Sequence, residues 1–407
     1  MQLKLLNIHK LLSNIATNLV GAFVPVIVFE ATGSLLYGVL AYIAQYIVRM
    51  TFAYLFRKPI QSKPQIMLVI RIIPILLYNI CVILIEHNLW LGVVGVVLFL
   101  GMSNAFKLPT EFILNYSSLS EDNEGSLGFS RLIEQVGIFI SFIVGGYLLQ
   151  TSKVLTVAIS IVIYSISVVP LVMYYIKCRE DKTFNKDAIS NASITFQKDE
   201  DRFNYGKVLS KKLLVIYGTT YFVYCFLDGF ASLFNMHLFA IKGSYAITGI
   251  MNAIYNVTYG VGNLVYGKVA EKRDIQTDVI VSCVLCAVLV GLISFLPITW
   301  LTYVAFAWLG FAYAPICLFN LQRLLSKSRI LGNSNSALYV REQSSNLSVL
   351  GASIMGVFGT ILPCFAVIML TLVASAALIP YHEEKSRRLI VDNLQYNEIR
   401  ARSKNRQ

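Results

Sequence analysis

Long apolar stretches with almost no charge recur along the chain, and Lys and Arg gather in alternate gaps between them. A helix that crosses a bilayer needs about 20 apolar residues, because the hydrocarbon core is about 30 Å thick. Together with the turn signals between them, these stretches predict twelve spans. The spans are expected at 10–31, 34–56, 65–86, 88–116, 127–150, 153–176, 212–241, 245–267, 275–297, 299–323, 333–361 and 363–380.

Composition points to the same class. The 407 residues are 56% hydrophobic and 14% charged, with a mean hydropathy of +0.65, which is too apolar for one soluble core of this length. A net charge of +12 could suggest a nucleic-acid partner, but the basic residues lie at helix ends and in loops instead of on one stripe. We expect an all-α integral membrane protein with the lipid bilayer as partner and no nucleic acid.

A charged segment divides the chain nearly in half. Residues 177–211 mix Lys, Asp, Asn and Ser and have the composition of a soluble linker. They would join an N-terminal six-helix bundle, 1–176, to a C-terminal six-helix bundle, 212–380, which a tail at 381–407 follows. Basic residues crowd the loops on the linker's side, whereas Lys153 and Lys242 are alone on the other. The positive-inside rule therefore predicts a multi-pass plasma-membrane protein with both termini in the cytoplasm.

The two halves repeat one another. Residues 125–146, GSLGFSRLIEQVGIFISFIVGG, match residues 335–356, NSALYVREQSSNLSVLGASIMG, at a constant offset of 210, which pairs Arg131 with Arg341 and Gly146 with Gly356. Each segment opens the fifth span of its half. Repeated halves are a recurrent transporter architecture, with the substrate site at the interface between the repeats.

Twelve spans, the six-plus-six repeat and the central linker together resemble the major facilitator superfamily over essentially the whole chain. The sequence GKVAEK at 267–272 is a variant of that family's loop motif G-x-x-x-D-R-x-G-R-R, whereas the loop after span two places Lys58 at the acidic position. Span five keeps Gly145 and Gly146 of the antiporter motif G-P-x-x-G-G and lacks its Gly-Pro.

This resemblance implies a secondary active transporter that moves a small molecule by alternating access, as a monomer, without enzymatic activity or cofactor. A proton is the expected coupling ion, and export of drug-like or metabolite molecules is favoured slightly over uptake by a nutrient permease. A non-transporting membrane receptor, or a membrane enzyme that acts on lipid, is the alternative of another class.

Charges inside a membrane span are costly and are candidate sites by default. Asp228 is the deepest acid, about seventeen residues into span seven, with no Lys or Arg within a helical turn or two. An isolated carboxylate favours its neutral form until a cation, a proton path or water satisfies it. We expect Asp228 to couple proton binding to movement; the alternative is a structural carboxylate paired with a base on a neighbouring helix.

Arg49 in span two, and Lys107 with Glu111 in span four, form a second charged group. Lys107 and Glu111 are four residues apart and could pair on one helix face; Glu111 could equally reach the headgroups. Arg49 and Lys107 are expected to line the cytoplasmic side of the cavity, either as partners of Asp228 or as contacts for an anionic substrate.

Residues near the starts of spans five and eleven, and in the loops that would face them, are candidates for cytoplasmic gates. They are Lys58, Arg131, Glu134, Gly267, Glu271, Arg341 and Glu342. The internal symmetry predicts that Glu271 meets Arg131 and that Lys58 meets Glu342. The competing interpretation is that these side chains reach the membrane surface without pairing.

Uncharged polar residues recur on spans one, two, four, eight, ten and eleven, which surround the cavity in the resembled family. The candidates for the substrate path are Asn14, Asn18, Gln45, Asn104, Asn252, Asn256, Tyr313 and Asn346. Hydrogen bonding between helices explains any single one equally well. No metal is assigned, because Cys283 and Cys286 lie inside a span as packing residues and the four histidines are far apart.

Overall fold

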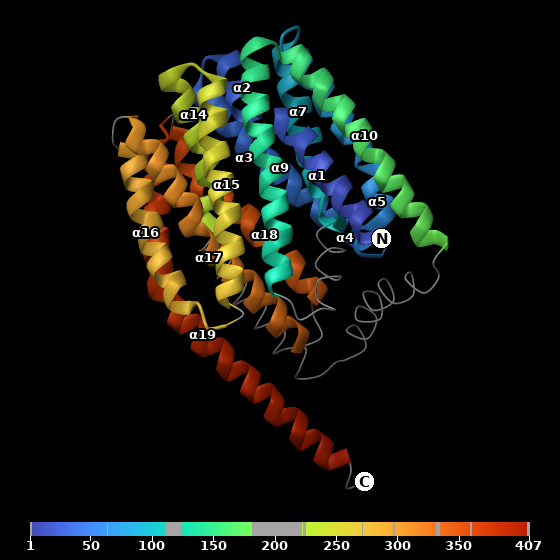
Figure 1. Ribbon diagram of the computed structural model, residues 1–407, viewed down its shortest axis with the longest axis vertical. Helices are drawn as coiled ribbons and strands as arrows, with labels where there is room; N and C mark the ends of the chain where they lie inside the picture. Colours follow the sequence, from blue (N-terminus) through green and yellow to red (C-terminus); the bar gives the residue numbers. More distant parts are fainter. Residues whose placement is uncertain are drawn as a thin grey trace.

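The computed structural model describes residues 2–62, 64–110, 124–180, 222, 225–270, 272–295, 298–330, 334–358 and 360–404. Every regular element in these ranges is a helix (Figure 1). The N-terminal half comprises α1 (Gln2–Gly21), α2 (Val24–Thr32), α3 (Leu35–Leu55), α4 (Arg57–Ser62), α5 (Pro64–Ile70), α6 (Ile72–Leu84), α7 (Leu89–Ala105), α9 (Glu124–Thr151) and α10 (Lys153–Glu180).

The C-terminal half begins, within the described residues, at a short 3₁₀ helix. Its elements are η2 (Cys225–Gly229), α14 (Phe230–Lys242), α15 (Tyr245–Ala270), α16 (Gln276–Phe295), α17 (Trp300–Ile330), α18 (Ser334–Ser353), η3 (Ile354–Phe358) and α19 (Leu362–Lys404). We call the end of the bundle where α10 ends at Glu180 the linker side, and the end where α2 and α14 end the distal side; they are the lower and upper ends in Figure 1.

Eight of the described helical stretches are long and apolar enough to cross a membrane. They are Leu5–Thr32, Leu35–Leu55, Ile66–Leu84, Leu89–Thr110, Lys153–Lys177, Gln276–Phe295, Trp300–Phe319 and Leu362–Lys385. Each coincides with a predicted span. On α16, Val281, Val284, Val288 and Leu292 are exposed at helical spacing, so this helix presents an apolar face of the kind that lipid covers.

The four other predicted spans coincide with α9, with η2 and α14, with α15, and with α18 and η3. These elements also contact the opposite half. Helices α9 and α15 run side by side (Figure 1), and α18 packs against α3. A Cβ atom on Gly146 would lie 2.6 Å from the carbonyl oxygen of Tyr245, so glycine is what allows α9 and α15 to approach so closely.

The repeat extends beyond the segments found in the sequence. Helices α2 and α14 end on Gly33 and Gly243, which keep the same offset and adopt φ values of 63° and 61°. Glycine is favoured at both positions because a side chain is strained in the left-handed region.

Two helical elements differ from what the predicted spans suggest. Span seven was expected as one helix over 212–241, but residues 225–229 form the 3₁₀ helix η2, and Asp228 lies within it. Beyond span twelve, which is predicted to end at 380, α19 continues without a break through the predicted tail to Lys404 and extends away from the bundle (Figure 1). Pro380 does not end this helix, although it removes one backbone donor.

Candidate functional site

A cavity of about 360 Å³ lies between the two halves, within the size range of small-molecule sites. Its walls come from α1, α2, α3, α7, α9 and the turn before α6 on one side and from η2, α14, α15 and α17 on the other. The structure brings most of the predicted path residues together here. Those that line the cavity are Asn14, Asn18, Gln45, Asn104, Lys107, Asp228, Asn252, Asn256 and Tyr313.

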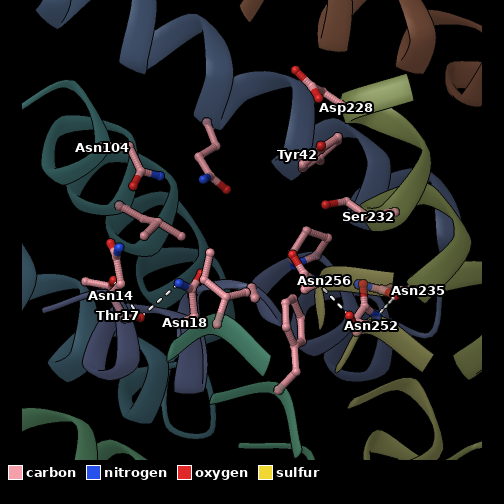
Figure 2. A pocket seen from close by; sticks show the side chains of 18 of the residues that line it. Asn14, Thr17, Asn18, Tyr42, Asn104, Asp228, Ser232, Asn235, Asn252 and Asn256 are labelled. Carbon is pink, nitrogen blue, oxygen red and sulfur yellow. Dashed lines mark hydrogen bonds between the residues drawn. The ribbon is translucent and has the colours of Figure 1, made fainter. Parts of the chain in front are cut away.

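Amide side chains form two groups on opposite sides of the cavity in Figure 2. In the N-terminal half, Asn18 donates through Nδ2 to the backbone oxygen of Asn14 at 2.8 Å. In the C-terminal half, Asn252 donates to Asn235 Oδ1, and Asn256 donates to the backbone oxygen of Asn252 at 2.7 Å. Asn235 also lines the cavity and was missed in the sequence. Both walls therefore offer hydrogen-bonding groups to a polar molecule.

Asp228 projects from η2 and is exposed to the cavity (Figure 2), instead of being enclosed by apolar neighbours. Two hydroxyl groups donate to its carboxylate. Tyr313 on α17 donates to Oδ1 at 2.7 Å, and Ser345 on α18 donates to Oδ2 at 3.0 Å. Ser345 was not predicted. The carboxylate is thus fixed between two helices while it faces the cavity.

Tyrosines cover much of the remaining wall. In the C-terminal half, the rings of Tyr255 and Tyr259 are stacked with centroids 6.3 Å apart, and Tyr259 stacks on Tyr313 at 5.8 Å. In the N-terminal half, Tyr42 and Tyr46 meet edge to face at 5.1 Å. All five line the cavity. Such rings provide apolar faces together with hydroxyl groups, which suits a substrate with both characters.

Arg71 is a cavity residue that sequence reasoning missed. It lies at the turn between α5 and α6, is only 2% exposed, and donates through Nε to the backbone oxygen of Ser103 at 3.1 Å. The signal that could have found it was present, since Arg71 falls six residues inside the predicted span 65–86 and a charge at such depth marks a candidate site.

Lys107 pairs across helices. Glu134 on α9 binds Lys10 Nζ at 2.9 Å through Oε2 and Lys107 Nζ at 3.4 Å through Oε1. Glu111, the predicted partner of Lys107, lies outside the described residues. Both partners found for Glu134 belong to its own half, so these contacts hold the N-terminal bundle together on the linker side.

The predicted pair between Lys58 and Glu342 is wrong. Glu342 Oε1 instead accepts a hydrogen bond from the guanidinium of Arg49, which forms an ion pair between α3 and α18. The Arg49 guanidinium also lies 5.6 Å from the centre of the Tyr46 ring. Arg49 therefore joins the two halves beside the cavity, which it does not line.

The remaining described residues predicted for the substrate path or the gates do not line the cavity. Asn346 is buried but lies outside the cavity lining, and Gly267 is buried in α15. Arg341 is partly buried on α18. The predicted pair of Glu271 with Arg131 involves Glu271 and the side chain of Arg131, which lie outside the described part of the chain.

A second set of contacts joins the halves on the distal side. Glu30 Oε2 accepts hydrogen bonds from Lys153 Nζ at 2.7 Å and from the Tyr245 hydroxyl at 2.8 Å. Gln150 Oε1 accepts one from the backbone N–H of Tyr245 at 2.9 Å. Tyr245 belongs to α15 in the C-terminal half, so these bonds close the distal side above the cavity.

A polar cavity between two repeated helical halves is where many membrane transporters bind their substrates. The chain belongs to the Major Facilitator Superfamily, which it matches over residues 10–340. The family makes the protein a multi-pass membrane transporter and not an enzyme. No curated protein sequence matches the chain significantly.

Several solved transporters share the fold. The human organic anion transporter MFSD10 (TETRAN) aligns with a TM-score of 0.60 at 12% identity over 92% of this chain and 98% of its own. A D-xylose-proton symporter gives 0.64 at 10% identity over 92% and 95%. A structure from a study of substrate recognition in proton dependent oligopeptide transporters gives 0.62 at 11% identity over 95% and 99%.

Proposed function

We propose that the protein is a proton-coupled secondary transporter that carries a small molecule by alternating access of the central cavity, with Asp228 as the residue that takes up and releases the proton. The observation that carries this proposal is the position of the Asp228 carboxylate, which faces the cavity between donors from α17 and α18. A proton-dependent oligopeptide transporter and a D-xylose-proton symporter are among the proteins with this fold.

Coupling follows from the two hydrogen bonds that Asp228 accepts. When the carboxylate takes up a proton it loses its charge, and the charge-assisted bonds from Tyr313 and Ser345 weaken. Because those donors lie on two different helices, protonation changes how firmly η2, α17 and α18 are held together. A ligand shifts a conformational balance only through such a difference between states, and the proton would act in this way.

We propose export as the direction, with uptake as the alternative, and place the linker side in the cytoplasm of a plasma-membrane monomer. The Gly145–Gly146 pair, which resembles the antiporter motif, lies in α9, where Gly145 packs on Leu19 and Gly146 on Tyr245 of the other half. Because α9 and α15 belong to opposite halves, a rocking motion of the halves must change the contact between these two helices. The amide and tyrosine lining supports a metabolite-like substrate with polar and aromatic groups.

The test uses the full-length protein in liposomes that contain a pH-sensitive dye. A substrate found by binding-induced thermal shift is first tested for counterflow, which separates a transporter from a membrane receptor of the same fold. The same substrate is then added to vesicles without an imposed gradient. Proton-coupled transport predicts a change in internal pH that requires the substrate. Counterflow without any proton movement would contradict proton coupling, and absence of counterflow would contradict transport of that molecule.

A further inference from the structure

The charges that line the cavity are separated by half. Among the described lining residues, the cations Arg71 and Lys107 belong to the N-terminal half, whereas the acid Asp228 belongs to the C-terminal half. In Figure 2, Asn104, which is close to Lys107 in sequence, lies across the cavity from Asp228. A molecule in the cavity would therefore meet two cationic side chains on one side and a carboxylate on the other.

Arg71 and Lys107 converge on the same end of α7. Arg71 donates through Nε to the backbone oxygen of Ser103, which fixes the plane of its guanidinium, and Ser103 precedes Lys107 by about one helical turn. Asn104, which lies between Ser103 and Lys107 in the sequence, also lines the cavity. A guanidinium presents its donors in a planar fork that matches a carboxylate, and an ammonium beside it adds charge.

Glu134 holds Lys107 at this wall. Its Oε1 lies 3.4 Å from Lys107 Nζ, while its Oε2 lies 2.9 Å from Lys10 Nζ. Glu134 is 7% exposed. In a setting of low dielectric, a cationic side chain attracts an anion more strongly than it would in water.

This charge separation is not inherited from the repeat. At the offset of 210 residues, Asp228 corresponds to Asn18, which lines the same cavity without a charge. Gly101 of α7 packs on the backbone of Gln45, and Gly310 of α17 packs on the backbone of Tyr255.

Gln45 and Tyr255 are 210 residues apart, so these two glycine contacts are equivalent in the repeat. The glycines themselves are 209 residues apart, and we align α7 with α17 at that offset. The counterpart of Lys107 is then Ile316, which is buried. Asp228 and Lys107 therefore each have an uncharged counterpart in the other half, so the two halves of the cavity differ in charge.

We propose that the cavity binds a small organic anion, whose carboxylate contacts Arg71 and Lys107 while the amides and tyrosines hold its body. This rests on the proposed transport function and adds the chemical class of the substrate. Asp228 on the facing wall then stays available for the proton, because a carboxylate substrate is repelled from it and attracted to the opposite side.

The test measures equilibrium binding to the full-length protein in detergent, where no gradient exists and proton coupling plays no part. The probes are three carboxylates, each with its carboxamide and its amine: benzoate with benzamide and benzylamine, and the corresponding sets built on hippurate and nicotinate. We expect binding by carboxylates and weaker binding by their neutral and cationic partners. Arg71→Gln and Lys107→Gln should each weaken carboxylate binding by about 10- to 100-fold, since each removes a hydrogen bond between charged groups.

Two further variants separate binding from structure. Lys10→Gln removes another partner of Glu134, and Lys10 lies outside the cavity lining, so carboxylate affinity should stay within about twofold of wild type, well under the 1.4 kcal/mol that a tenfold change represents. Arg71→Lys keeps the charge and should recover part of the affinity. The proposal is overturned if no carboxylate binds, if the amines bind better, if Arg71→Gln and Lys107→Gln bind like wild type, or if Lys10→Gln weakens binding as much as Lys107→Gln.

Discussion

Arg49 on α3 and Glu342 on α18 form an ion pair between the two halves, 293 residues apart in the chain. It lies in the parts of both helices that are closer to the linker side, whereas the contacts of Glu30 with Lys153 and Tyr245 lie on the distal side. If the halves rock about the cavity, opening toward the linker side must break the first contact and preserve the second. The ion pair therefore stabilises the state that is closed on the linker side.

Reversing the charge of Arg49 tests this role. Arg49→Glu places two carboxylates together and should favour the state open to the linker side, with transport rate impaired more than substrate affinity, because a population balance changes and no cavity contact is lost. Combining it with Glu342→Arg restores the attraction with its sign reversed. A double-mutant cycle on transport rate should give a coupling of about 0.5–3 kcal/mol.

Lys58 supplies the control for this cycle. It was the partner of Glu342 that the sequence predicted, and in the structure Glu342 binds Arg49 instead. Lys58→Glu combined with Glu342→Lys should give additive effects. The opposite result would be recovery of the transport rate in Lys58→Glu with Glu342→Lys, together with additive losses for Arg49 and Glu342. That result would show that Glu342 pairs with Lys58, and not with Arg49, during transport.

The close crossing of α9 and α15 gives a stability prediction. Gly146→Val would place side-chain atoms against the backbone of Tyr245, which a Cβ alone already approaches to 2.6 Å. Overpacking of this kind costs about 1–3 kcal/mol. The thermal midpoint in detergent should fall, whereas Val144→Leu, at an exposed position on the same helix, should leave it nearly unchanged. Equal midpoints for the two variants would mean that the helices are not in tight contact there.

Topology can be tested by labelling single cysteines with an impermeant reagent in intact cells. A cysteine at Gly243 should be labelled from outside, while cysteines at Ser193 and Ser403 should react only after permeabilisation, because basic residues gather on the linker side. The unmodified chain, with its seven cysteines, provides the background. Labelling of Ser193→Cys from outside would reverse the proposed orientation.

Sequence reasoning found features that depend on one segment of the chain and missed contacts between distant segments. The spans follow from hydropathy, which is a local property of the chain, and the placement of the amides at the cavity follows from the resemblance to a family whose corresponding helices surround it. Partners across helices do not, because pairing depends on how the halves pack: Arg49 lies opposite Glu342 only because α3 and α18 lie side by side. Ser345 reaches Asp228 through a fold in which 117 residues separate them.

The break in span seven was missed for a related reason. The segment around Asp228 is apolar enough for a continuous spanning helix, so hydropathy does not reveal the 3₁₀ turn. Its conformation depends on packing against α18, where Gly229 lies against Ala352. Arg71 is a different case, because its depth in a predicted span was visible in the sequence and its link to Ser103 was not.

The most direct test of the account is the effect of Asp228→Asn on coupling, measured in proteoliposomes with one transported substrate. Wild type should accumulate the substrate against its gradient when a pH gradient is imposed, and Asp228→Asn should lose this accumulation while it still exchanges substrate across the membrane. Asp278→Asn is the matched control, since Asp278 pairs with Arg273 at the start of α16, outside the cavity lining. Uphill accumulation by Asp228→Asn at the wild-type level would show that Asp228 does not carry the coupling proton.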